Sequence, residues 1–108
     1  MEDIKSKSYT LRDSEGSWLG QVVLTSDGMF ASVTDYGNFS FSWRSFSGDF
    51  REFVCSLKED YFAGKMYQGI AYVAHGKKIE QACDRYSKKI LKPLQEVLKK
   101  EIIENPEW

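Results

Sequence analysis

The clearest chemical pattern in this chain is a set of cations in its last third. At about 100° per residue, six of them fall within an arc of roughly 120° on one helix. They are Lys77, Lys78, Arg85, Lys88, Lys89 and Lys92, called the basic stripe below. Ile79, Tyr86 and Ile90 lie opposite this arc, and Glu80 and Asp84 lie to one side. Such a stripe is suited to phosphates or to an acidic protein surface, and the alternative is a solvated face of good helix formers.

A second candidate surface is an aromatic loop after residue 43. Arg44 and Phe46 lie in this loop, and Tyr61, Phe62 and Tyr67 follow in the chain. Arginine and aromatic side chains carry much of the binding energy at protein interfaces. The alternative is that most of these rings complete the core between helix and sheet. We therefore predict a partner-binding surface made of the basic stripe with Arg44 and Phe46.

An enzymatic interpretation would centre on His75, the only histidine, with Cys55 or Cys83 as the nucleophile. Neither cysteine lies in a reactive-site motif, and both fall at apolar helix positions where a thiol usually serves in packing. One histidine and two cysteines fall short of the four ligands of a structural zinc site, and their spacing does not support a catalytic one. With no CxxC motif and no signal peptide pattern ahead of them, the simpler interpretation is that both cysteines are reduced in a cytoplasmic setting.

The remaining chemical motifs have structural interpretations. The carboxylate pairs Asp13 with Glu15 and Glu59 with Asp60 fit turns or helix caps better than acid and base catalysis. Neither GxGxxG nor GxxxxGK[ST] is present, so a phosphate-binding loop is not indicated. We predict no catalytic residue, no metal and no cofactor, with a small enzyme centred on His75 as the remaining alternative.

Composition indicates one globular domain over residues 1–108. Charged residues make up 29% of the chain and apolar residues 42%, which is typical of folded proteins. The net charge of −1 gives no overall attraction to nucleic acid or anionic lipid, although residues 77–108 hold eight cations against six anions. No apolar run approaches the roughly 20 residues of a membrane span, and the N-terminus lacks a signal peptide pattern. The sequence thus predicts a soluble cytoplasmic protein that does not enter a membrane.

The positioning elements begin with a four-stranded antiparallel β-meander over residues 1–43. Asp27-Gly28 and Tyr36-Gly37-Asn38 predict tight hairpin turns. The first strand, over residues 6–12, is expected at a sheet edge.

Two of these strands differ in their alternation. Phe39, Phe41 and Trp43 alternate with serines, which predicts one buried face and one wet face. The strand that begins at Trp18 alternates less cleanly, which predicts a more central strand buried on both sides.

A helical part is expected over residues 49–104, with 105–108 as a tail. Asp49 and Glu52 have the spacing of a capping box, so a short helix should run from about Asp49 to Leu57. Asp60 then begins a brief turn, but Gly64 and Gly69 leave residues 60–76 ambiguous.

The last expected element is the helix that carries the basic stripe, over residues 77–103. At 1.5 Å per residue it would be roughly 40 Å long, which exceeds the size of a compact domain of about 13 Å radius of gyration. Pro93 therefore predicts a break or kink at residues 91–92. Because the apolar phase continues from Ile90 to Leu94, a kinked continuous helix is the alternative. The predicted fold is α+β, with this long, Pro-kinked or broken C-terminal helix and the short helix packed on one face of the sheet.

Several stretches together resemble small uncharacterised proteins encoded by bacteriophages and prophages. They are Leu24-Thr25-Ser26-Asp27-Gly28-Met29-Phe30-Ala31, Asp35-Tyr36-Gly37-Asn38, Trp43-Arg44-Ser45-Phe46, Lys65-Met66-Tyr67 and the charged terminal helix. The resemblance implies an accessory protein, and some such proteins are stoichiometric inhibitors of host defence, including anti-CRISPR proteins. The strong negative charge of DNA-mimicking inhibitors is absent here, so inhibition by mimicry is not expected.

Our leading hypothesis is a non-enzymatic binding protein, encoded by a phage, that inhibits a bacterial host protein such as a defence complex. The first alternative is a small nucleic-acid-binding protein that uses the same basic stripe on phosphates. A homodimer through the terminal helix or the strand over residues 6–12 is also left open.

Overall fold

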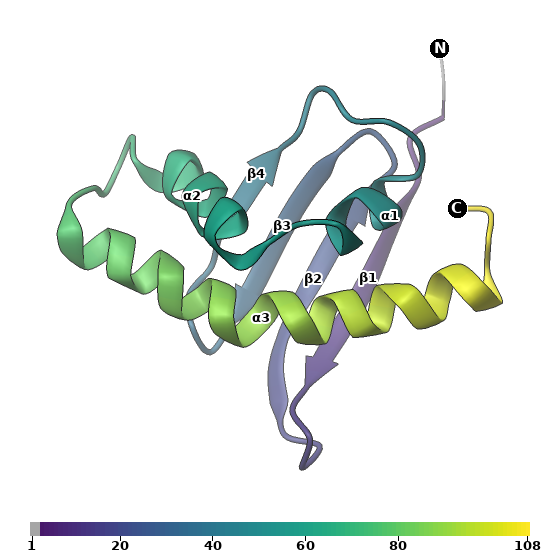
Figure 1. The fold of residues 1–108 in the computed structure, drawn as a ribbon, viewed down its shortest axis with the longest axis horizontal. Helices are drawn as coiled ribbons and strands as arrows, with labels where there is room; N and C mark the ends of the chain where they lie inside the picture. The colour runs from purple at the N-terminus through teal and green to yellow at the C-terminus, as the bar shows by residue number, and fades with distance from the viewer. Residues whose placement is uncertain (1–2) are drawn as a thin grey trace.

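Four strands pair with their neighbours in sequence to form one antiparallel sheet in the order β1-β2-β3-β4. They are β1 Ser6–Arg12, β2 Trp18–Thr25, β3 Met29–Thr34 and β4 Ser40–Ser42. The structure is a computed structural model and describes residues 3–108 (Figure 1). Gly28 and Gly37 occupy the two predicted tight turns at φ values of +104° and +120°, which glycine adopts without steric cost. The predicted meander is confirmed.

The three helices all lie on one face of this sheet (Figure 1). On the covered face, Leu11, Val22, Leu24 and Phe30 are fully buried. On the other face, alternate residues of β2 and β3 are exposed, so the prediction that β2 is buried on both sides is wrong. The apolar residues of β2 alternate less regularly because the Trp18 end of β2 has a register shift against β1. Within the described part of the chain, no second layer covers this strand.

Helix α1 is short and starts where the sequence predicts. It spans Phe50–Cys55, and the side chain of Asp49 caps it by accepting a hydrogen bond from the backbone N–H of Arg51. It ends before the predicted Leu57. There, Gln95 Nε2 donates to the carbonyl oxygens of Val54, Cys55 and Leu57. A side chain from a distant helix therefore binds carbonyls that another helical turn would have used.

The predicted brief turn after Asp60 is instead the 12-residue helix α2, Glu59–Ile70. Its inner side buries Phe62, Ala63 and Met66 against the sheet and the last helix. Gly69 lies at the contact with β4, where an added Cβ would come within 2.3 Å of the Ser40 carbonyl oxygen. The glycine that weakens the local helix signal thus allows α2 to approach the sheet closely.

Helix α3 runs without interruption over Lys77–Glu104, so the predicted break at residues 91–92 is wrong and the continuous alternative holds. The molecule measures 40 × 38 × 20 Å, and α3 lies along its longest dimension (Figure 1). The prediction assumed a roughly spherical domain, whereas this molecule is flat and its long dimension accommodates the whole of α3. Proline inside a helix costs about 3 kcal/mol. Ile90, Leu91, Leu94 and Leu98 are at most 2% exposed, and burying each contributes about 1.5–3 kcal/mol, which outweighs that cost.

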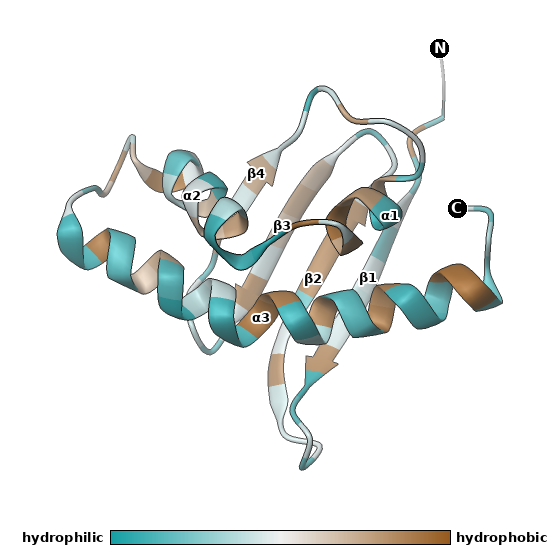
Figure 2. Ribbon diagram, viewed as in Figure 1, coloured by the Kyte–Doolittle hydropathy of each residue, from teal (hydrophilic) through white to brown (hydrophobic). Residues whose placement is uncertain are grey.

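The apolar side of α3 faces the sheet and its polar side faces solvent. Figure 2 shows this as hydrophobic bands that recur between hydrophilic ones along the helix. Tyr86 is buried in the middle of this contact, and its hydroxyl forms a hydrogen bond with Ser32 of β3. This bond satisfies the one polar group that Tyr86 brings into the core.

An ionic cluster joins α1, α3 and β1 around Arg51, whose side chain is 0% exposed. Its guanidinium contacts the carboxylates of Asp49 at 2.7 Å and Glu101 at 3.1 Å. Glu101 also accepts hydrogen bonds from Lys7 Nζ and Tyr9 Oη. Burial and the bond to Glu101 raise the pKa of Tyr9, which therefore stays a neutral donor. Every charge that the fold buries here has an opposite charge beside it.

The same guanidinium holds the C-terminal tail. Arg51 Nη1 donates to the carbonyl oxygen of Asn105 at 3.0 Å, and Nη2 donates to that of Pro106 at 3.4 Å. The guanidinium carbon lies 5.1 Å from the centre of the Trp108 ring, within the range of a cation–π contact. The predicted tail therefore folds back against the helical layer.

This cluster predicts a loss of stability in acid. The hydrogen bond from Arg51 lowers the pKa of Asp49. Burial alone would raise the pKa of Glu101, but bonds from Lys7, Tyr9 and Arg51 outweigh it and lower that pKa. A carboxyl group whose pKa is lower in the folded state stabilises the fold above its unfolded pKa, near 4, and this contribution disappears as the pH falls.

We therefore expect the free energy of unfolding, measured in urea, to fall as the pH is lowered from 6 to about 3. The double variant Asp49→Asn, Glu101→Gln should be less stable at pH 6 and should show a shallower pH dependence. Asp35 and Glu96 are exposed, so the variant Asp35→Asn, Glu96→Gln is a matched control. An equal slope in the test variant and the wild type would contradict this assignment.

Candidate partner-binding surface

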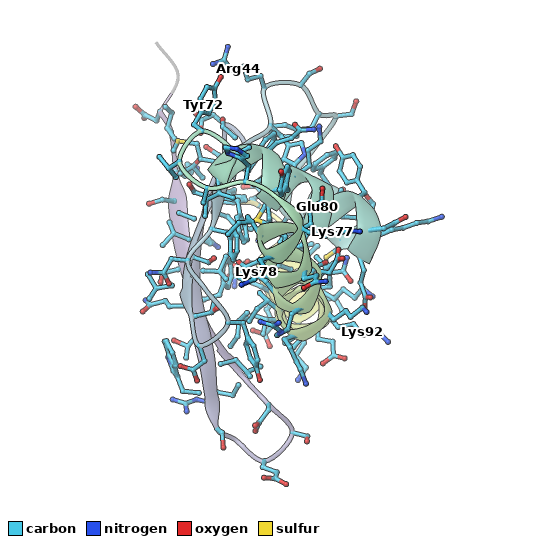
Figure 3. The ribbon with its side chains drawn as sticks, turned by 90° about the vertical axis from the view of Figure 1, so that its left-hand side faces the viewer. Arg44, Tyr72, Lys77, Lys78, Glu80 and Lys92 are labelled. Carbon is cyan, nitrogen blue, oxygen red and sulfur yellow. The ribbon has the colours of Figure 1, made fainter. Side chains whose placement is uncertain are left out.

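All six cations of the basic stripe are exposed on α3. Their orientation follows from the other side of the helix, where Cys83, Tyr86, Ile90 and Leu94 are buried. Figure 3 looks along α3 from its start and shows Lys77 and Lys92 on the side of the helix away from the sheet. Within residues 3–108, none of the six makes an ion pair. Their charge is therefore available to a partner.

One stripe residue also touches the fold. The Nζ atom of Lys89 lies 5.9 Å from the centre of the Tyr36 ring, in the turn between β3 and β4. At this distance a cation–π contact contributes about 0.5–1 kcal/mol at an exposed site. The contact places Lys89 at the border between the stripe and the sheet.

The loop between α2 and α3, residues 71–76, adds two apolar side chains at the start of the stripe. Tyr72 is 98% exposed and Val73 is 86% exposed. The turn is held by hydrogen bonds from the N–H groups of Val73 and Ala74 to the Ile70 carbonyl, both 3.0 Å long. Tyr72 and Val73 are therefore displayed on an ordered turn. We call this pair the apolar tip.

The other end of the tip is fixed as well. Gly76 N–H donates to Tyr67 Oη at 3.1 Å, and Gly76 adopts a φ of +109° before Lys77 begins α3. Sequence reasoning missed the apolar tip. The adjacent pair Tyr72-Val73 beside Gly76 was visible in the sequence, but nothing local distinguishes an exposed aromatic residue from one that completes a core.

An acidic groove runs beside the stripe, between α2 and α3. Two adjoining hollows of about 430 and 230 Å³ share Asp60, Ala63 and Asp84 as lining residues. Glu59 and Lys88 line the larger hollow, and Glu80 lines the smaller. The side on which the sequence places Glu80 and Asp84 thus also receives carboxylates from α2. Over the first turns of α3, the basic stripe therefore lies beside an acidic groove.

The two predicted site residues outside α3 do not join the stripe. Arg44 is exposed in the loop after β4, and in Figure 3 it lies at the top of the view, apart from the stripe residues Lys77, Lys78 and Lys92. Phe46 is partly buried, and its ring centre lies 5.0 Å from that of Phe50 and 5.8 Å from that of Phe53. Phe46 packs in the aromatic part of the core, which leaves only part of its ring for a partner.

Comparison with known proteins gives one finding. The model of a family described as a phage family matches residues 1–85. The chain belongs to this phage family. The matched range includes the sheet, α1, α2, the apolar tip and the first three stripe cations, Lys77, Lys78 and Arg85. Neither the curated proteins nor the solved structures give a significant match.

The residues of the enzymatic alternative are not brought together in this phage protein. His75 is exposed in the α2–α3 loop, whereas Cys55 lies at the end of α1, where its thiol donates to the Gln95 carbonyl. Cys83 is buried in α3. Burial raises the pKa of both thiols, which keeps them protonated and unreactive. Nothing in this arrangement activates a nucleophile.

Two further findings concern the part of the phage protein that the structure describes. Residues 3–108 contain no group of three or more histidine, cysteine, aspartate or glutamate side chains placed to hold a metal ion. Among the same residues, no helix combines the length and the apolar character needed to cross a membrane.

Proposed function

We propose that this phage protein is a non-enzymatic binding protein that inhibits a bacterial host defence protein, in the manner of anti-CRISPR proteins, in the host cytoplasm. The observation that carries the proposal is the ordered surface formed by the basic stripe and the apolar tip. Charged side chains that are exposed and without ion pairs can meet an acidic partner without first breaking bonds inside the protein. Tyr72 and Val73 would add the apolar contact that protein interfaces concentrate at their centre.

Membership of a phage family supports the host as the source of the partner. A phage protein without an activated nucleophile can still act on a host protein by occupying its surface in a one-to-one complex. The more specific part of the proposal is that the bound host protein belongs to a defence system and is inhibited. It predicts that cells expressing the protein lose one defence activity.

Nucleic acid is the second candidate, and the stripe favours it because six cations lie on one helix face. The acidic groove limits where phosphates could lie, since Asp60, Glu80 and Asp84 would repel any phosphate placed over it. Affinity capture from bacterial lysate, with and without nuclease, separates the two. A stoichiometric protein retained after nuclease treatment supports the first proposal. Nucleic acid alone, with affinity that falls steeply with salt, supports the second.

Reversing the charge of Lys88, Lys89 and Lys92 to glutamate should lower affinity for the captured protein by at least about 100-fold, because each change sets like charges against each other. The melting temperature should fall by no more than about 8 °C, since all three side chains are exposed and the Lys89 contact with Tyr36 contributes only about 0.5–1 kcal/mol. Calorimetric titration and thermal unfolding measure the two effects.

The control reverses Arg12, Lys58 and Lys100, three exposed cations outside the stripe, by the same total charge. It should bind like the wild type. Unchanged affinity in the stripe variant, or an equal loss in both variants, would refute binding through the stripe.

A further inference from the structure

The sheet face that no helix covers has an unusual composition for an exposed surface. It is called the open face below and consists of Ser6, Ser8, Thr10, Gln21, Val23, Met29, Ala31, Val33, Ser40 and Ser42. All ten residues are exposed and uncharged, although 29% of the chain is charged. Within residues 3–108, Arg12 at the end of β1 is the one cation on the same side of the strand alternation; it lies at the register shift against β2 and donates to the Gly16 carbonyl oxygen. Charge that would oppose association is therefore confined to one end of this face.

Its apolar side chains are contiguous. Val23 of β2 pairs with Ala31 of β3, and Met29 and Val33 lie on the same side of β3, two residues from Ala31. Val23, Met29 and Val33 are 38%, 50% and 58% exposed. The small side chain of Ala31 leaves a shallow hollow of about 300 Å³ between Val23 and Val33. The hollow at Ala31, with the larger side chains of Val23 and Val33 beside it, could receive side chains from another sheet.

The polar rim of this face already satisfies part of its hydrogen bonding. Gln21 Nε2 donates to the hydroxyl of Ser8 across β1 and β2 at 2.7 Å. Hydroxyl groups of Ser40 and Ser42 border the other side. Covering the face would leave the hydroxyl groups of Ser6, Thr10, Ser40 and Ser42 to find partners across the interface, but apart from Arg12 at its end it would remove water from no charge.

We infer that two copies of this protein associate through their open faces, sheet against sheet. A face with so little charge offers little to an acidic protein or to a phosphate, whereas a second copy presents an equally uncharged face by symmetry. The strands, of seven, eight, six and three residues, cover roughly 400 Å² on each copy, so the two faces would bury roughly 800 Å² in total, the size of a weak, transient interface. Because α3 lies on the opposite layer, the basic stripe stays exposed on both copies (Figure 3).

The other surfaces suit self-association less well. The free edge of β1 is flanked by Lys5, Lys7 and Arg12, which would oppose the same residues of a second copy. The other edge strand, β4, has only three residues.

The test measures mass by light scattering during size-exclusion chromatography, from low micromolar to near-millimolar protein. The wild type should approach twice the chain mass of 12.5 kDa as concentration rises. Ala31→Arg places a charge in the centre of the open face and should remain monomeric throughout. Val33→Lys is the second variant, and both positions are exposed in the monomer, so circular dichroism should show an intact fold. Ser47→Arg, in an exposed loop outside the sheet, is the matched control and should dimerise like the wild type.

A monomeric wild type at every concentration would overturn this inference. A wild type that dimerises while Ala31→Arg and Val33→Lys dimerise equally would also overturn it, because another surface would then hold the copies together. The result does not depend on the identity of any host partner.

Discussion

Replacing Arg51 with methionine is expected to lower the free energy of unfolding by about 3–5 kcal/mol, the usual cost of removing one partner from a buried ion pair. The change leaves the carboxylate of Asp49 without its counter-charge and Glu101 with only Lys7 and Tyr9. It also releases the carbonyl groups of Asn105 and Pro106. A domain of this size has a total stability of about 5–15 kcal/mol, so the loss is a large fraction of the total. Urea unfolding monitored by circular dichroism measures the effect.

Two further variants test the cause. Arg12→Met removes an exposed arginine that donates only to the Gly16 carbonyl, and it should change stability by no more than about 0.5 kcal/mol. Combining Arg51→Met with Glu101→Gln should cost less than the sum of the single changes, because the second change neutralises a carboxylate that the first leaves unpaired. Additive losses, or a loss below about 1 kcal/mol for Arg51→Met, would show that the ionic cluster is not what holds this end of the fold.

Replacing Phe62 with alanine should also lower the free energy of unfolding by about 3–5 kcal/mol, because it opens a cavity where all layers meet. The ring of Phe62 is fully buried between β3 and α3. Its centre lies 5.4 Å from that of Phe30, edge to face, and 6.0 Å from that of Tyr86. The measurement is again urea unfolding, with far-ultraviolet circular dichroism of the folded state to follow the helix content of α2.

The matched control lies on the same helix. Gln68→Ala removes an exposed side chain of α2 and should change stability by no more than about 0.5 kcal/mol. Phe62→Leu keeps most of the apolar volume and should cost less than Phe62→Ala. If Phe62→Ala cost no more than Gln68→Ala, α2 would not be packed against the sheet as described.

Local patterns were sufficient for the meander and for the face of α3. The turn at Gly28, the alternation of Phe39 and Phe41 with serines, and the spacing of Ile90 and Leu94 each depend on a few neighbouring residues. Such signals are present in the sequence because backbone geometry and side-chain periodicity are local properties. The basic stripe was predictable for the same reason.

Helix α2 and the continuity of α3 were not predictable in this way. Gly69 weakens an isolated helix by about 1 kcal/mol relative to alanine, and Pro93 weakens one by about 3 kcal/mol. In the folded protein, the contact of Gly69 with Ser40 and the burial of Leu94 reverse the local preference. Both elements therefore depend on packing against residues that are distant in the sequence, which a local pattern does not include.

For this protein, the sequence by itself determined the order of the strands, the helical layer on one face of the sheet and which side of α3 is basic. Only the tertiary structure decided that residues 59–70 form a full helix, that Arg51 is buried among groups from both ends of the chain, and that Tyr72 and Val73 are left in solvent beside the stripe. The physical reason is that burial is not a local property. A charged or aromatic side chain is buried or exposed according to the groups that pack against it. Those partners lie as far apart in the chain as Lys7 and Glu101, 94 residues from each other, and only folding brings them together.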